Sequence, residues 1–244
     1  MTDTREVALV TGAARGIGLA TVRRLLEDGF HVVMVDQNAQ ALEASAATLR
    51  DTSNLVEHHA LSITDRAAVS ALIGSLPRLD VLVNNAAIFW DGKFDTATDD
   101  DYRRMYEVNV VGTFIVAQEA ARVMQRGGRI INIASRAYLA GYAHSAYITS
   151  KAGVLGLTRS MAMDLAERGI LVNAIAPGLI ETEMFRSLTP ERQQELIAKQ
   201  PTKTVGQPED IANGIAFFAS PRTRNVTGQI LTLDGGRSMG IAVY

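Results

Sequence analysis

Short apolar runs alternate with longer stretches of helical periodicity along this chain. Most of the runs are almost continuously apolar, which is typical of parallel strands covered by helices on both faces. They predict strands at Val7–Thr11, His31–Asp36, Leu55–Ala60, Val81–Asn84, Arg129–Ile133, Leu171–Ile175 and Ile230–Leu233.

The stretches between these strands have the spacing of amphipathic helices. Ile17–Asp28 places apolar residues on one side and charged residues on the other, and Gly29 is a usual residue just past a helix end. Ala39–Arg50 and Asp65–Ser75 fit two further crossover helices. Because strands joined by helices pair in parallel with right-handed crossovers, we predict an α/β fold with a doubly wound sheet.

Two later helical stretches, Tyr102–Gln125 and Ala146–Glu167, are apolar around much of their circumference. A helix that is apolar on both sides needs a second surface to cover it, so we predict a subunit interface there. The alternative is a thicker core within one subunit.

Composition narrows the class of protein. The chain has 244 residues, of which 47% are hydrophobic, and a net charge of -2. These values fit one domain spanning residues 1–244, with no linker and no basic surface for nucleic acid or membranes. The absence of cysteine excludes thiol chemistry, and the four histidines lack metal-ligand spacing, so we expect no metal site. No apolar run is long enough for a secretory signal or a spanning helix, which favours a cytoplasmic protein.

A glycine-rich turn follows the first predicted strand and leads into the first helix. It contains Gly12, Arg15, Gly16, Ile17 and Gly18. Glycines let the backbone turn tightly and approach a pyrophosphate, whose charge is met by N–H groups at the start of the helix. The strand–turn–helix context therefore predicts a dinucleotide site rather than an ordinary turn.

Asp36 ends the second strand about 20 residues beyond the glycines, the spacing of a ribose-binding carboxylate. A carboxylate there accepts hydrogen bonds from ribose hydroxyls and repels a 2′-phosphate, so it favours NAD over NADP. Arg15 is the counter-argument, because a guanidinium could pair with that phosphate. Asp36 as a helix cap and Arg15 as a solvated loop residue are the alternatives.

Taken together, the motifs of this chain resemble the short-chain dehydrogenase/reductase family over nearly the whole length. The matching pieces are Thr11–Gly18, Asn84-Asn85-Ala86, Asn109, Ser135, Tyr147-x-x-x-Lys151, Pro177-Gly178-x-x-x-Thr182 and Asp234-Gly235-Gly236. In this order they are highly specific, whereas Tyr-x-x-x-Lys alone is not.

The resemblance implies a Rossmann-like domain with a seven-stranded parallel sheet, assembled as a homotetramer or a dimer through the two long helices. It implies that Asn84, Asn85 and Ala86 help to seat the cofactor, as do Pro177 and Gly178. It also implies that Ile180, through its backbone, and Thr182 hold the nicotinamide carboxamide.

Two positions depart from the family pattern. Ala87 stands where glycine is usual, which adds a methyl group to a crowded turn. Ser62, before Ile63, stands where an aspartate commonly meets the adenine amino group. A serine hydroxyl can still accept that bond, so we expect weaker adenine affinity and not a loss of binding.

The chemistry is expected at Tyr147, Lys151 and Ser135. Hydride transfer to a carbonyl leaves an alkoxide that needs a proton, and the reverse reaction needs a base. Lys151 lies one helical turn after Tyr147, so its ammonium is expected to lower the pKa of the phenol. Ser135 would hold the reacting oxygen. Tyr147 as a core residue and Lys151 as a surface residue are the alternative.

Asn109 is a poor choice for the interior of an apolar helix unless it has a partner or a role. The resemblance implies that it holds a water that links Lys151 to solvent. The alternative is a side chain satisfied by a neighbouring carbonyl. His144 could be considered as a general base, but the sequence places no acid or nucleophile to orient it.

Loops at the carboxyl ends of the strands should determine the substrate. The candidates are Ile88-Phe89-Trp90, the segment Arg136 to Tyr142, and a lid at about residues 179–203. Arg136 could hold a substrate carboxylate or face solvent, and we favour the solvent-facing interpretation.

The sequence thus predicts an NAD(H)-dependent oxidoreductase that interconverts a secondary alcohol and a ketone, a small-molecule substrate. An NADP(H)-dependent reductase of ketones or 3-oxoacyl groups is the first alternative. A non-catalytic dinucleotide sensor, or the same fold with another chemistry such as reduction of a conjugated double bond, is less consistent with the residues present.

Overall fold

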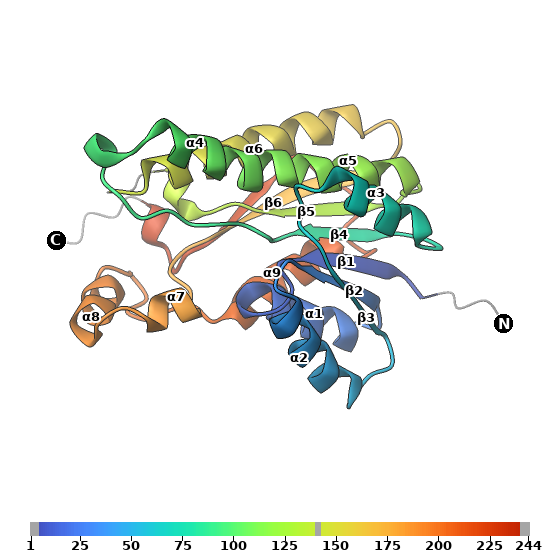
Figure 1. Ribbon diagram of the computed structural model, residues 1–244, viewed down its shortest axis with the longest axis horizontal. Coiled ribbons are helices and arrows are strands. Elements are labelled where there is room, and N and C mark those ends of the chain that lie inside the picture. The colour runs from blue at the N-terminus through green and yellow to red at the C-terminus, as the bar shows by residue number, and fades with distance from the viewer. Residues whose placement is uncertain (1–4, 140–142, 240–244) are drawn as a thin grey trace.

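The computed structural model describes residues 5–139 and 143–239. Its centre is a seven-stranded parallel sheet with the strand order β3-β2-β1-β4-β5-β6-β7 (Figure 1). The doubly wound, Rossmann-like fold expected from the sequence is confirmed. The strands are β1 (Val7–Thr11), β2 (His31–Asp36), β3 (Val56–Ala60), β4 (Val81–Asn84), β5 (Arg129–Ile133), β6 (Leu171–Pro177) and β7 (Ile230–Leu233).

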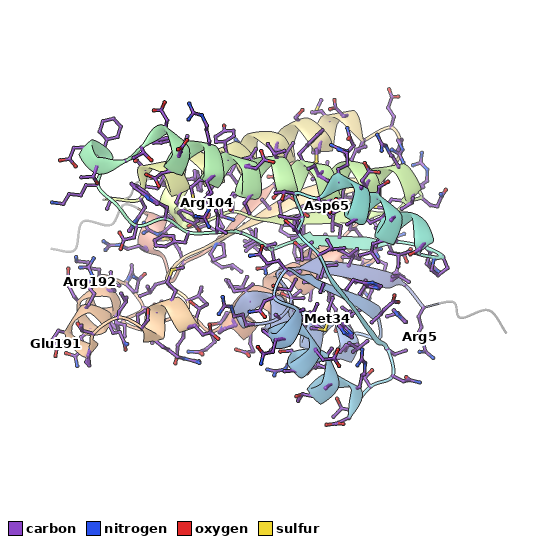
Figure 2. All side chains as sticks on the ribbon, viewed as in Figure 1. Arg5, Met34, Asp65, Arg104, Glu191 and Arg192 are labelled. Carbon is purple, nitrogen blue, oxygen red and sulfur yellow. The ribbon has the colours of Figure 1, made fainter. Side chains whose placement is uncertain are left out.

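Helices cover both faces of the sheet (Figure 1). One face is covered by α1 (Gly16–Glu27), α2 (Ala39–Arg50) and α9 (Pro208–Ala219), and the other by α3 (Arg66–Ser75), α5 (Thr113–Val123) and α6 (Ser145–Asp164). Each face has its own apolar cluster, and Met34 of β2 lies in the one beneath α1 and α2 (Figure 2). Burial on both faces explains why the strands are apolar without alternation.

The order of the strands reverses between β1 and β4. From β1 the chain moves outward to β2 and β3, and it then returns to place β4 on the other side of β1. Loops on opposite sides of this reversal diverge at the carboxyl ends of the strands and leave a crevice, the usual ligand site of such sheets. The glycine turn follows β1 and therefore lies at this crevice.

The prediction of one continuous helix at Tyr102–Gln125 is wrong, because the helix is interrupted. The structure has α4 (Asp99–Tyr106), then a π-helical segment η2 (Glu107–Gly112), and then α5. The start is earlier than expected because Thr98 and Asp101 form a capping box. The π segment contains Asn109, whose side chain bonds groups outside the helix, which apolar periodicity does not reveal.

The expected lid segment lies apart from the two helical layers, at the carboxyl end of the sheet (Figure 1). It contains α7 (Glu183–Arg186) and α8 (Pro190–Ala198), and Glu191 and Arg192 of α8 are exposed (Figure 2). Short 3-10 turns occur at Phe94–Thr96, Arg136–Tyr138 and Arg237–Met239. Among the described residues, no helix is both long enough and apolar enough to cross a membrane.

Candidate active site

The glycine turn is shaped by close contacts with the loop after β4. Gly12 has a φ of 62°, and a Cβ at this position would lie 2.8 Å from the Cα of Ala86. A Cβ on Gly18 would lie 2.0 Å from the carbonyl oxygen of Gly12. Larger residues at these two positions are therefore excluded by sterics, and the start of α1 remains open to an approaching ligand.

The two asparagines after β4 have different surroundings. The Nδ2 of Asn85 donates to the carbonyl oxygens of Thr11 and Gly12, at 3.1 and 3.0 Å, and so holds the glycine turn in place. The Nδ2 of Asn84 donates to Oδ1 of Asn132 at 3.0 Å, in the buried space between β4 and β5. Asn84 thus supports the sheet, while Asn85 reaches the crevice.

A cavity of about 260 Å³ lies beside the glycine turn. Seven of the residues that the sequence nominated for the cofactor line it: Gly12, Arg15, Asp36, Ser62, Ile63, Asn85 and Ala86. Sequence reasoning did not nominate for the cofactor the neighbours that complete the lining, namely Ala14, Val35, Gln37, Asn38, Ala41, Leu61, Ala87, Ile88 and Val108. Most of them directly flank a nominated residue, so the loops as wholes were the available signal.

Asp36 presents a carboxylate to this cavity. Its Oδ2 accepts a hydrogen bond from the backbone N–H of Ala14 at 3.1 Å, and its Oδ1 accepts one from Asn38 at 3.0 Å. These bonds fix the carboxylate at the end of β2 without neutralising it. The cavity therefore has a fixed negative group where a ribose would bind.

Arg15 forms an ion pair with Glu183, the first residue of α7, and both side chains are largely exposed. The pair connects the glycine turn to the segment that was expected to be a lid. Because Glu183 already partners the guanidinium, a ligand phosphate would have to compete for it.

Ser62 and Ala87, the two departures from the family pattern, are both accommodated. The hydroxyl of Ser62 lies 2.9 Å from that of Thr64 and also accepts from the backbone N–H of Thr64. Ala87 is exposed at the edge of the cavity, so its methyl group is not compressed. Ile63 is buried, and a Cβ on Gly112 would lie 2.7 Å from its Cδ1, so it anchors this loop against the π segment.

The turn after β6 approaches the same crevice from the other side. A Cβ on Gly178, after Pro177, would lie 2.6 Å from the Cα of Asp234, so the loop after β7 packs directly on this turn. Ile180 is buried and bridges to Gly206. A Cβ on Gly16 would lie 3.8 Å from Cγ2 of Thr182, which places this threonine opposite the glycine turn.

Ser135, Tyr147 and Lys151 meet at the ends of β5 and α6. The Ser135 side chain lies near enough to Tyr147 to affect its pKa, and the Nζ of Lys151 lies 5.9 Å from the centre of the Tyr147 ring. Lys151 is only 3% exposed, and its Nζ donates to the carbonyl oxygen of Ile133 at 2.7 Å. The alternative of a surface lysine is therefore wrong.

The electrostatics at Tyr147 differ from the expectation. Burial raises the pKa of Tyr147 above its ordinary value, although the hydrogen bond with Ser135 partly opposes this. Burial also lowers the pKa of Lys151 to about 8, since a dry site disfavours an ammonium. The expected lowering of the phenol pKa by Lys151 is thus wrong for the chain alone, because desolvation outweighs the opposing effect of Ser135. Tyr147 keeps its proton at neutral pH.

Asn109 is completely buried in the π segment. Its Oδ1 accepts from the backbone N–H of Ile88 at 2.9 Å, and its Nδ2 donates to the carbonyl oxygen of Ile88 and to the hydroxyl of Ser150. These bonds match the alternative in which protein groups satisfy the side chain, and they tie α6 to the loop after β4. The role in a proton path stays a prediction.

The loop after β4 also reaches Tyr147. The ring of Phe89 lies edge-on to that of Tyr147, with centroids 5.0 Å apart. His144 has a left-handed backbone with a φ of 69°, and its Nδ1 lies 3.1 Å from a carboxylate oxygen of Asp91. The structure thus supplies an acid for His144 that the sequence did not place. Tyr142, at the end of the nominated loop 136–142, lies outside the described residues.

In the described part of the chain, no three His, Cys, Asp or Glu residues gather as metal ligands would. The parallel sheet, the crevice with its anion-binding turn, and the Ser–Tyr–Lys group beside it define a dinucleotide-dependent oxidoreductase. A bound nicotinamide would accept or donate the hydride.

Comparison with known proteins agrees with this class. Residues 12–238 match a family model described as enoyl-(acyl carrier protein) reductase. The chain is 40% identical to the (2S)-[(R)-hydroxy(phenyl)methyl]succinyl-CoA dehydrogenase subunit BbsD of Thauera aromatica, over 96% of this chain and 97% of that one. It is 38% identical to the 3-oxoacyl-[acyl-carrier-protein] reductase FabG of Rickettsia bellii, with coverage of 96% and 97%.

A solved structure agrees as well. The blue fluorescent protein from a metagenomic library, in complex with NADPH, superposes with a TM-score of 0.89 and 38% identity, covering 96% of this chain and 98% of that one. The chain belongs to the short-chain dehydrogenase/reductase family.

Proposed function

We propose that this protein is an NAD(H)-dependent oxidoreductase that interconverts a secondary alcohol and a ketone. The observation that carries the proposal is the meeting of the Ser135 and Tyr147 side chains beside the buried ammonium of Lys151, at the ends of β5 and α6. Two hydroxyl groups aimed at one point can hold a carbonyl oxygen. The experiment is to mix a panel of secondary alcohols with NAD and to follow the absorbance of reduced nicotinamide.

In the reduction direction, the residues act on the carbonyl oxygen. Ser135 and Tyr147 both donate hydrogen bonds to it, which polarises the carbonyl and fixes its position. As charge develops on this oxygen, Tyr147 gives up its proton, and the nearby ammonium of Lys151 stabilises the phenolate that forms. The raised pKa of the resting phenol suits this donor role.

Asp36 supports NAD as the nucleotide. Its fixed carboxylate suits two ribose hydroxyls and repels a 2′-phosphate, and Arg15, the basic residue among the described residues that line this cavity, is engaged by Glu183. The blue fluorescent protein was solved with NADPH, so relatives of this fold take the phosphorylated form. The charge at the end of β2 is the reason to propose the other choice here.

The nucleotide preference is tested by replacing that charge. Like-charge contacts cost several kcal/mol, so we expect kcat/KM to favour NAD over NADP by about 100-fold. Asp36→Ala should reduce this preference at least about tenfold, mainly through the KM for NADP. Asp28→Ala is the matched control, since Asp28 pairs with Arg24 on the surface of α1. A wild-type preference for NADP would contradict the proposal for the nucleotide and leave the hydride chemistry standing.

The relatives suggest a substrate class. Their names describe a 3-oxoacyl thioester in one case and a hydroxylated acyl-CoA in the other, so both have an oxygen function near a thioester. We include such thioesters, together with simpler hydroxy and oxo acids, in the panel. The Ser135–Tyr147 pair supports a carbonyl substrate over a conjugated double bond, because both hydroxyls converge on one oxygen.

We also propose that the subunits assemble through α5 and α6. Phe114 and Met163 are apolar and exposed on these helices, and Met163 is 79% exposed. A second copy would cover them, as the all-round apolar character of both helices requires.

A charge on this face should break the assembly. We expect wild-type protein to sediment as a dimer or tetramer, and Phe114→Glu/Met163→Glu to sediment as a monomer, because a buried unpaired carboxylate is costly. Met184→Glu, on exposed α7, is the control and should assemble normally. Monomeric wild-type protein at micromolar concentration would favour the alternative of a thicker core.

A further inference from the structure

Arg136 lies directly after Ser135 and begins the 3-10 turn Arg136–Tyr138. Its side chain is half-buried, which does not fit the solvent-facing interpretation. Among residues 5–139 and 143–239 it has no hydrogen bond and no ion pair. By contrast, the buried Arg129 of β5 lies 2.9 Å from the carboxylate of Glu6. A half-buried guanidinium without a partner is costly in a folded protein, so we expect this arginine to have a functional role.

The charges around Arg136 leave the site positive. Burial lowers the pKa of Arg136, the neighbouring Arg237 lowers it further, and Asp234 opposes them. Asp234 already accepts backbone N–H bonds from Gly236 at 3.0 Å and Ser238 at 2.7 Å. Arg237 donates to the backbone carbonyl oxygen of Lys199, and this oxygen carries no charge. The charges that act on Arg136 are therefore one further guanidinium and one carboxylate, with which it forms no ion pair.

Of these three charged groups, only Asp234 borders a cavity, and neither Arg136 nor Arg237 lines it. Asp234 lines a cavity of about 600 Å³ between residues 179–211 and the loop 232–239. The turn after β6 lies between Ser135 and the loop 232–239. Gly178 in this turn has no side chain, so the turn and the loop pack closely together. Because Arg136 directly follows Ser135, a substrate held by Ser135 and Tyr147 would have its neighbouring substituents beside Arg136.

We propose that Arg136 binds an anionic oxygen group of the substrate, a carboxylate or a phosphate, close to the carbonyl that is reduced. This inference rests on the proposed function and adds the substrate class to it. A guanidinium presents paired N–H groups in the geometry of a carboxylate or phosphate, and such charge-assisted bonds are the strong ones. The anion would supply the partner that Arg136 lacks among the residues that the structure describes.

The test compares matched charged and neutral substrates. Acetoacetate and ethyl acetoacetate differ in the carboxylate, and 2-oxopropylphosphonate and its diethyl ester differ in the charge of a phosphonate placed equally near the ketone. For Arg136→Gln, the kcat/KM ratio of charged to neutral substrate should fall by about 10- to 100-fold in one pair, mostly through KM. Arg136→Lys should restore part of the ratio. The pair that responds identifies the anion, and unchanged ratios in both pairs would overturn the inference.

A binding measurement separates this inference from the proposed function. In a Tyr147→Phe background with NADH, titration calorimetry of the same four compounds needs no turnover. Weaker binding of one charged compound after Arg136→Gln supports the anion site, even if the wild type reduces none of them. If Arg136→Gln leaves the binding of every compound unchanged in the Tyr147→Phe background, the anion site is overturned, even if the wild type is an active reductase. Arg50→Gln, at the end of α2, is the control and should change neither readout.

Discussion

Replacing Tyr147 with phenylalanine should cut kcat by about a thousandfold while nucleotide affinity stays within a factor of about two. General acid–base groups typically contribute 10²- to 10⁴-fold, and here the phenol is the group that Ser135 holds in place. The ring and its edge-on contact with Phe89 remain in the variant, so the site keeps its shape. Stopped-flow turnover and NADH titration measure the two quantities.

The control for this variant is Tyr106→Phe. Tyr106 ends α4 and is 42% exposed, and it is not part of the Ser135–Tyr147–Lys151 group. We expect normal turnover from this protein. If Tyr147→Phe kept more than about a tenth of wild-type turnover, the assignment of the proton donor would fail.

Replacing Lys151 with methionine should abolish turnover and also change the pH dependence of stability. In the folded chain the pKa of Lys151 is about 8, against 10.5 for an ordinary lysine. Between these values the unfolded chain holds a proton that the folded chain has released, so the stability of the wild type rises with pH. Below about pH 8 both states are protonated, and the folded state bears the full cost of a buried ammonium.

The methionine variant lacks this contribution. From about pH 7 to pH 10, the free energy of unfolding of the wild type should therefore gain on that of Lys151→Met by roughly 2 to 3 kcal/mol. Denaturant titrations of cofactor-free protein at both pH values provide the measurement. Lys93→Met removes an exposed lysine, and no buried charge, so it is the control. A pH-independent difference for Lys151→Met would show that the ammonium is not desolvated.

These two residues also show where sequence reasoning stopped. Spacing placed Lys151 on the same face of a helix as Tyr147, and the structure agrees. The sign of the pKa shift at Tyr147 was wrong, because spacing shows that a cation is near but not how much water has been removed from both groups. Desolvation depends on the packing of β5, the loop after β4 and α6 around the site.

The surroundings of Asn109 and Arg136 also depend on tertiary contacts that the sequence does not show. An asparagine in an apolar helix signalled that something unusual occurs there, but only the fold showed the π segment and the bonds to Ile88 and Ser150. For Arg136, one residue in a loop offered two opposite interpretations. The approach of the loop after β7, nearly 100 residues away in the chain, decided against the solvated one.

The sequence by itself determined the alternation of strands and helices, the parallel sheet, the glycine turn and the Tyr-x-x-x-Lys pair. These features depend on periodicity, local sterics and fixed spacing, which are properties of neighbouring residues. The tertiary structure alone decided the partner of Arg15, the burial of Lys151, the acid beside His144 and the unpaired state of Arg136 within the described residues. Each of these depends on charges and solvent exclusion contributed by distant segments, and local pattern contains no information about such contacts.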